Sequence, residues 1–106
     1  GVQTCALPIS FADDRSCAVS CTGTGESFIR AVFGHAVHTQ LRAGATLAQA
    51  CALALDEVRR YRGSGGCIAI SHGGEIALPF NAGVMYRAWL GDGGAVRVAI
   101  RSDDET

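Results

Sequence analysis

The sequence predicts an α+β fold in which two neighbouring helices cover one face of an antiparallel sheet. Three observations lead to this prediction. Apolar residues recur every three or four positions through residues 26–61, as in amphipathic helices. Short apolar or alternating runs separated by glycine-rich turns follow from residue 67 onward. One further short apolar run, at residues 16–20, precedes the helices, so the expected order is strand, helix, helix and then four strands.

The composition limits the classes of function that the chain can have. Its 106 residues are 48% hydrophobic and 18% charged, which fits one globular domain or part of one and excludes a disordered chain. The net charge is -1 and the nine basic residues form no patch, so we expect no nucleic-acid partner. No apolar run approaches the roughly 20 residues that span a bilayer, so we expect no membrane partner either.

The cysteines indicate the compartment. The five of them show no C-x-x-C spacing, and no histidine stands at the distance typical of a metal finger: Cys5, Cys17, Cys21, Cys51 and Cys67. Cys17 and Cys21 lie too far apart along an extended strand to form a disulfide. We therefore expect small buried thiols in a reducing compartment. Since no segment has the pattern of a signal peptide, we expect a cytoplasmic protein.

Residues 1–9 (GVQTCALPI) differ in character from the rest of the chain. They have neither periodicity nor capping residues, and they can be read codon by codon as GGA-GTT-CAG-ACG-TGT-GCT-CTT-CCG-ATC, which resembles a short-read sequencing adapter translated in frame. We expect this segment to be non-native. The alternative is an ordinary N-terminal extension that ends in a turn at Pro8. On the favoured interpretation the native sequence enters near Ser10 or Phe11, and residues 10–106 are the C-terminal part of a longer protein.

Residues 16–20 (SCAVS) predict a buried strand, preceded by a polar turn at residues 13–15. The run CTGTGE at residues 21–26 follows, where this strand ends and the first helix begins. Its glycines remove the Cβ atoms that would keep another molecule away from the backbone, and the first amides of a helix lack internal partners. Such a loop can offer N–H groups to an oxyanion or a carboxylate.

Two other interpretations of residues 21–26 exist. The run can be a tight strand-to-helix turn in which Thr24 caps the helix, and because glycine-rich turns are common, the residues alone favour this interpretation. A phosphate-binding loop is weakly supported, since the pattern G-x-x-x-x-G-K-[ST] does not occur.

Residues 26–43 predict the first helix and residues 46–61 the second. The apolar face of the first contains Ile29, Val32, Phe33, Ala36, Val37 and Leu41, and that of the second contains Leu47, Cys51, Ala54, Val58 and Tyr61. Gly34 weakens the first helix by up to about 1 kcal/mol relative to alanine, so we expect close packing there. Thr46 and Gln49 form a capping box, and the short link at residues 44–45 predicts an antiparallel helix pair.

The remaining strands follow the glycine-rich break at residues 63–66. Residues 67–71 and 75–80 predict a hairpin with its turn at residues 72–74, and residues 84–90 and 95–101 predict a second hairpin with its turn at residues 91–94. In the last strand Val96, Val98 and Ile100 alternate with arginines, so we expect one buried face.

Several other residues are candidates for a site. His35 and His38 share a helix face, but a metal site needs a third ligand that the sequence does not offer. We therefore expect surface or interface histidines and neither a metal nor a cofactor. His72 falls in a turn and should be solvated. Tyr86, Arg87 and Trp89 can line a pocket. Core packing is the favoured interpretation for these three, with Arg87 pointing outward or pairing with an acid. Asn81 is expected to be a turn residue.

A family resemblance covers nearly all of residues 11–100. The segments that carry it are CAVSCTGTGE (17–26), SFIR (27–30), GSGGCIAI (63–70), IALPFN (76–81) and MYRAW (85–89). Together they resemble the C-terminal end of the β subunit of isoaspartyl peptidase/L-asparaginase, the plant-type asparaginases of the N-terminal-nucleophile hydrolases. The resemblance implies that the α+β fold is a fragment of an αββα sandwich. It also implies a partner α subunit, the N-terminal part of the β subunit, and αβ heterodimers that pair into a heterotetramer.

The resemblance implies a chemistry as well. The precursor of such an enzyme cleaves itself ahead of a threonine, which becomes the nucleophile with its own α-amine as the base. This threonine attacks the side-chain amide of L-asparagine or a β-aspartyl peptide bond, and water resolves the acyl-enzyme. By the same resemblance, Thr22 and Gly23 correspond to the oxyanion hole, and the loop Thr22, Gly23, Thr24 and Gly25 borders the substrate.

The departures from the family pattern limit what this chain can do alone. The family's nucleophile lies in a G-T-[VI]-G segment and its substrate-holding arginine and aspartate in a G-R-V-G-D-like segment, and neither occurs here. Thr24 is rejected as the nucleophile, because a helix pattern follows it where the family's nucleophile begins a strand. We expect the isolated chain to be inactive. The alternative is a non-catalytic paralogue or subunit that binds a small carboxylate anion at the loop of residues 22–25.

Overall fold

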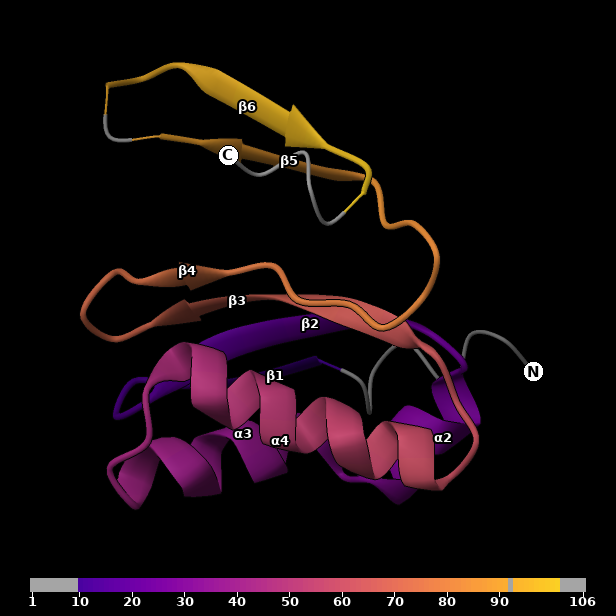
Figure 1. The fold of residues 1–106 in the computed structure, drawn as a ribbon. Helices are drawn as coiled ribbons and strands as arrows, with labels where there is room; N and C mark the ends of the chain where they lie inside the picture. The colour runs from indigo at the N-terminus through magenta and orange to yellow at the C-terminus, as the bar shows by residue number, and fades with distance from the viewer. Residues whose placement is uncertain (1–9, 92, 102–106) are drawn as a thin grey trace.

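A computed structural model of the chain describes residues 10–91 and 93–101. The predicted adapter-derived segment, residues 1–9, lies outside the described residues. A four-stranded sheet with strand order β1-β2-β3-β4 forms the centre of the fold, with helices on one face and a separate two-stranded hairpin, β5-β6, on the other (Figure 1). The predicted mixed α and β architecture, with the helices gathered on one sheet face, is confirmed in this outline.

The central sheet is antiparallel throughout. Its strands are β1 (Ser10–Asp13), β2 (Cys17–Gly23), β3 (Gly65–Ser71) and β4 (Ile76–Ala77). The expected order did not include β1. Its four residues show little pattern of their own and become a strand by pairing with β2 from Ser10 opposite Ser20 to Asp13 opposite Cys17.

The turn between β1 and β2 is held by one acid. The Asp13 carboxylate accepts hydrogen bonds from the Arg15 backbone N–H at 2.8 Å and from the Arg15 guanidinium at 2.9 Å. These hydrogen bonds hold the pKa of Asp13 well below its usual range. The predicted polar turn at residues 13–15 is confirmed.

The prediction of one continuous helix over residues 26–43 is wrong. The structure divides it into α2 (Gly25–Arg30) and α3 (Phe33–Arg42), with Val32 between them in the left-handed region at φ 49°. Phe28 and Phe33 are both buried, with their ring centroids 5.1 Å apart. In one continuous helix, residues five apart would point about 140° away from each other. The break therefore lets both rings enter the same core.

Two local predictions about the helices are confirmed. A Cβ on Gly34 would lie 2.3 Å from the Cβ of Phe11, so the helix approaches β1 closely at this position. The helix α4 (Leu47–Arg60) begins with the predicted capping box. Thr46 Oγ1 accepts from the Gln49 N–H at 3.2 Å, and the Thr46 N–H donates to Gln49 Oε1 at 3.0 Å. The helices α3 and α4 pack against each other beneath the sheet (Figure 1).

The later strands are shorter than predicted or shifted. The strand β3 begins at Gly65 and not at residue 67, and the predicted strand 75–80 is reduced to β4 with an isolated bridge between Gly66 and Phe80. The second hairpin consists of β5 (Arg87–Leu90) and β6 (Val96–Ala99). The expected buried face of the last strand is wrong, since Val96 and Val98 are 73% and 72% exposed. No layer of the described chain lies over that face.

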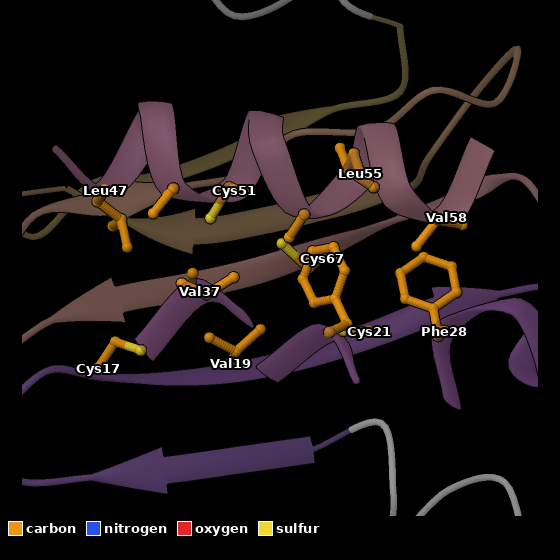
Figure 2. Packing of buried hydrophobic residues seen from close by; sticks show 14 residues of the cluster. Cys17, Val19, Cys21, Phe28, Val37, Leu47, Cys51, Leu55, Val58 and Cys67 are labelled. Carbon is orange, nitrogen blue, oxygen red and sulfur yellow. The ribbon is translucent and has the colours of Figure 1, made fainter. Parts of the chain in front are cut away.

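The hydrophobic core lies between the helices and the central sheet (Figure 2). Side chains of α4 point down onto those of β2, β3 and the shorter helices, and four cysteines are among them: Cys17, Cys21, Cys51 and Cys67. All four are buried free thiols, as predicted, whereas Cys5 lies outside the described residues. Burial raises the pKa of Cys21 to about 12, so this thiol stays protonated at neutral pH. No helix of the described residues is long and apolar enough to cross a bilayer.

The raised pKa of Cys21 predicts a loss of stability in alkali. The contribution of the buried thiol to the free energy of unfolding is fully present below the ordinary thiol pKa of 9.0. It decreases as the pH rises toward the folded-state pKa of about 12. The melting temperature of the complete protein should therefore fall between pH 9 and pH 11, and Cys21→Ala should reduce this fall. Equal pH dependence in the two proteins would contradict the assignment.

Candidate active site

The glycine-threonine loop lies at one end of the central sheet. The strand β2 extends through Gly23, beyond the predicted end at residue 20, and α2 begins at Gly25. Thr22 is exposed and lies on the face of β2 opposite the core, because alternate residues of the strand are buried and exposed. Gly23 is the last residue of the strand, so the predicted position of the loop, between a strand and a helix, is confirmed.

Two glycines allow β2 and β3 to approach closely beside this loop. Gly23 is the partner of Gly65 in the ladder, with φ of 132° and 152° respectively. A Cβ on Gly23 would lie 2.2 Å from the Ser64 carbonyl oxygen, and a Cβ on Gly65 would lie 2.1 Å from the Thr22 carbonyl oxygen. Both positions therefore require glycine, on grounds of space as well as backbone conformation.

The ladder also decides where the backbone groups of Gly23 point. The Gly65 N–H donates to Asn81 Oδ1 at 2.8 Å, and the Gly65 carbonyl accepts from the Asn81 N–H at 2.8 Å. Two residues that are opposite each other in an antiparallel ladder either bond N–H to carbonyl in both directions, or both point their N–H and carbonyl groups away from the partner strand. The N–H of Gly23 is therefore turned away from β3, toward the side where β1, within the described residues, reaches only as far as Ser20.

Thr24 has a different role from the predicted one. It is the residue before α2, but its side chain makes no capping hydrogen bond to that helix. Instead, the Thr24 N–H donates to the Ser64 carbonyl at 2.9 Å, and Thr24 Oγ1 accepts from the Ser64 N–H at 3.2 Å. The interpretation in which the Thr24 side chain caps the helix is wrong. Its hydroxyl instead binds Ser64 and extends the pairing of β2 with β3 by one residue beyond the end of the ladder. A helix follows Thr24, as the sequence predicts, and the rejection of Thr24 as a nucleophile stays a prediction.

A pocket of about 530 Å³ opens beside this loop, and we call it the loop pocket. The end of β2, the start of β3 and the segment before β5 line it. The lining residues are Thr22, Gly23, Thr24, Ser64, Gly65, Gly66, Ala82, Val84, Met85 and Tyr86. Tyr86 is 81% exposed, so the expected core packing of this residue is wrong. The alternative interpretation, in which Tyr86 lines a pocket, is confirmed. The sequence did not predict that this pocket lies beside the loop, because nothing local connects residues 82–86 with residues 22–24.

Arg87 lies on the inner side of the same segment. It is only 4% exposed, and it donates to the carbonyl oxygens of Met85 at 3.2 Å and Arg101 at 2.7 Å. Its guanidinium lies 4.6 Å from the centroid of the Phe80 ring. The expectation that Arg87 points outward is wrong, because the residue is buried and backbone carbonyls from different segments converge on the guanidinium.

The histidines do not contribute to the loop pocket. His38 Nδ1 is 2.6 Å from Ser16 Oγ, and its ring packs against Phe11. His35 and His72 are exposed, as expected. Within residues 10–91 and 93–101, no group of three or more histidine, cysteine or acidic side chains is arranged to hold a metal ion.

A larger cavity, of about 610 Å³, lies between the open face of the central sheet and the β5-β6 hairpin. We call it the interlayer groove. Apolar and small side chains line it: Ser10, Phe11, Ala12, Ala18, Val19, Ser20, Ile68, Ala69, Ile70, Ile76, Leu78, Ala88 and Trp89. Since none of these side chains is an acid, a base or a strong nucleophile, the interlayer groove has no chemistry of its own, and the loop pocket is the candidate active site.

Comparison with known proteins finds relatives for most of the chain. A family model described as asparaginase matches residues 7–100. The chain is 48% identical to an isoaspartyl peptidase of Escherichia coli over 81 residues, which cover 74% of this chain and 25% of that protein. It is 38% identical to a probable isoaspartyl peptidase/L-asparaginase of Arabidopsis thaliana over 88 residues, covering 79% of this chain and 26% of that protein.

These matches show the family of the chain, but they cover only part of each relative. The chain spans about a quarter of the length of the relatives that it matches. The roles of Thr22, Gly23, Thr24 and Gly25 in a reaction stay a prediction. The match over residues 7–100 nevertheless includes β2, the loop, the helices and β3 to β6 in one stretch. This chain belongs to the asparaginase family.

Proposed function

We propose that this chain is the C-terminal part of a threonine-nucleophile amidohydrolase that converts L-asparagine to aspartate and ammonia and cleaves β-aspartyl dipeptides. Its relatives are isoaspartyl peptidases and L-asparaginases by name. The observation that carries the proposal is the backbone of Gly23, which is turned away from β3 at the rim of the loop pocket that Thr22 also lines.

The proposed chemistry assigns this chain the stabilising half of the site. When a nucleophile attacks the amide carbon of the substrate, the carbonyl oxygen gains negative charge. A fixed N–H and a hydroxyl that are already in place stabilise this charge without having to reorganise. Gly23 supplies the N–H and Thr22 the hydroxyl. Thr24 and Gly25 hold the next part of the loop against the substrate, and the attacking threonine comes from a segment outside this chain.

The proposal includes the layer that the open sheet face requires. Ile68, Ile70 and Ile76 point to this face and are between 46% and 52% exposed. A second sheet packed on such a face would bury these side chains and complete an αββα sandwich. We assign that sheet to the α subunit and the N-terminal part of the β subunit, which a self-cleaving precursor would supply in the cytoplasm. The same proposal makes residues 1–9 a non-native segment and the αβ heterodimer one half of a heterotetramer.

The assay of the complete gene product tests this function. We expect it to release ammonia from L-asparagine and to cleave β-aspartyl-leucine, with the nucleophile in an upstream G-T-[VI]-G segment. The isolated chain of 106 residues should do neither. A complete gene without that upstream threonine would contradict the catalytic proposal.

A second candidate function is a non-catalytic protein that binds a small carboxylate at the loop pocket. It is motivated by the lining of the pocket, which contains hydroxyls and backbone amides but no base. Calorimetry with aspartate on the complete protein, beside the ammonia assay, separates the two. Binding of aspartate without turnover of either substrate would favour the second function.

A further inference from the structure

Asn81 pairs with the first residue of β3 beside the loop pocket. It follows β4 and the bridge at Phe80, and it makes two hydrogen bonds with Gly65, one through its side chain and one through its backbone, each 2.8 Å long. One is from the Gly65 N–H to Asn81 Oδ1, and the other is from the Asn81 N–H to the Gly65 carbonyl. The first residue of β3 is thereby bound on the side away from β2.

This position matters because Gly65 is the ladder partner of Gly23. A Cβ on Gly65 would lie 2.9 Å from the Cα of Gly23, so the two glycines touch backbone to backbone. Asn81 saturates the N–H and the carbonyl of Gly65, which keeps these groups turned away from β2. A rotation of Gly65 that brought its N–H toward Gly23 would break the bond to Asn81 and displace the backbone of Gly23.

The segment that carries Asn81 is itself held firmly. The Phe80 ring lies under the Arg87 guanidinium, and Arg87 also donates to the Leu78 carbonyl at 3.4 Å. The Cys67 N–H donates to the Pro79 carbonyl at 3.0 Å. Residues 78–81 are therefore held by Arg87 on one side and by Cys67 on the other. Asn81, at the end of this segment, in turn holds Gly65 in place.

We propose that Asn81 is a positioning residue for the oxyanion hole, acting through Gly65 to hold the Gly23 N–H in its catalytic direction. The inference rests on the proposed function, because it assigns a purpose to the Gly23 N–H. It adds a residue that is not among those lining the loop pocket and that lies 16 positions along the chain from its partner Gly65.

Steady-state kinetics of the complete protein provide the first test, with Asn81→Ala as the variant. Because a displaced donor weakens transition-state stabilisation more than substrate binding, we expect kcat to fall by about 10- to 100-fold and KM to change by less than about twofold. The matched control is Ser71→Ala, which also removes a side-chain acceptor of a backbone N–H, that of Glu75 at 3.1 Å, but at the far end of β3. The kcat of this control should stay within about twofold of wild type.

Hydrogen–deuterium exchange of the same proteins provides a test that needs no turnover. Asn81→Ala should accelerate exchange in residues 22–25 and 64–66, whereas Ser71→Ala should leave both segments unchanged. Asn81→Asp keeps an acceptor oxygen for the Gly65 N–H and should restore the protection. Asn81→Leu, which keeps the size of the side chain but has no acceptor oxygen, is the test variant if Asn81→Ala does not fold.

The outcomes separate this inference from the proposed function. Wild-type kcat in Asn81→Ala, or equal acceleration of exchange in Asn81→Ala and Ser71→Ala, overturns the positioning role. A wild-type protein that hydrolyses neither substrate overturns the proposed function, and the exchange comparison then still decides whether Asn81 holds the loop.

Discussion

Replacing Gly23 with alanine in the complete protein is expected to lower kcat/KM for β-aspartyl-leucine by about 100-fold or more. The new Cβ would lie 2.2 Å from the Ser64 carbonyl oxygen and 2.6 Å from the Cα of Gly65. Both are backbone atoms, so the conflict can be relieved only by separating β2 from β3. This movement would displace the Gly23 N–H from the place that we propose for the oxyanion. The φ of 132° adds strain for any residue with a Cβ.

Gly73→Ala is the matched control for this prediction. Gly73 lies in the turn between β3 and β4, and a Cβ there would meet only Ser71 Oγ, at 3.9 Å. We expect wild-type activity and a melting temperature close to that of wild type for this variant. If Gly23→Ala retained wild-type kcat/KM, Gly23 would not be part of the oxyanion hole.

Replacing Arg87 with methionine is expected to have the largest effect on stability, a loss of about 3 kcal/mol. The guanidinium donates to carbonyl oxygens of Met85, Leu78 and Arg101, and methionine would leave these buried or part-buried acceptors without this donor. The contact with the Phe80 ring would also be lost. Urea unfolding of the complete protein measures the change.

The control for this second prediction is Arg97→Met in the neighbouring strand β6. Arg97 is exposed, so its replacement should change the free energy of unfolding by less than about 0.5 kcal/mol. Similar losses in the two variants would show that burial of the Arg87 guanidinium does not stabilise the fold.

The sequence predicted features that depend on neighbouring residues. The capping box of Thr46 and Gln49, the polar turn at residues 13–15 and the start of a helix just after the glycine-threonine loop are all local, and all are confirmed. The close approach at Gly34 was also predictable, because a glycine inside a helix pattern is costly unless something packs against it.

Features that depend on distant residues were not predicted. The apolar periodicity continues through Val32 and Phe33, so the pattern gave no sign of the break that brings Phe33 to the core beside Phe28. Arg87 was expected outside because an isolated arginine is costly to bury, and only the fold shows the carbonyl groups that bind it.

The candidate site divides in the same way. Thr22 to Gly25 could be identified from the residues and from the resemblance, because glycines at a strand end leave a recognisable pattern. The second wall at residues 82–86 and the link from Asn81 to Gly65 depend on the register of β3 and β4, which no local pattern specifies.

The central claim is that residues 10–101 form the oxyanion-stabilising half of an amidohydrolase whose nucleophile lies in another segment. A chimera tests it most directly: this segment replaces the matching 25% of the isoaspartyl peptidase of Escherichia coli, to which it is 48% identical over 81 residues. The decisive measurement is the kcat/KM of the chimera for β-aspartyl-leucine. We expect it to lie within about 10-fold of the parent enzyme, and Gly23→Ala in the chimera to lower it by about 100-fold or more. A chimera that folds with a cooperative melt but hydrolyses no β-aspartyl-leucine would contradict the claim.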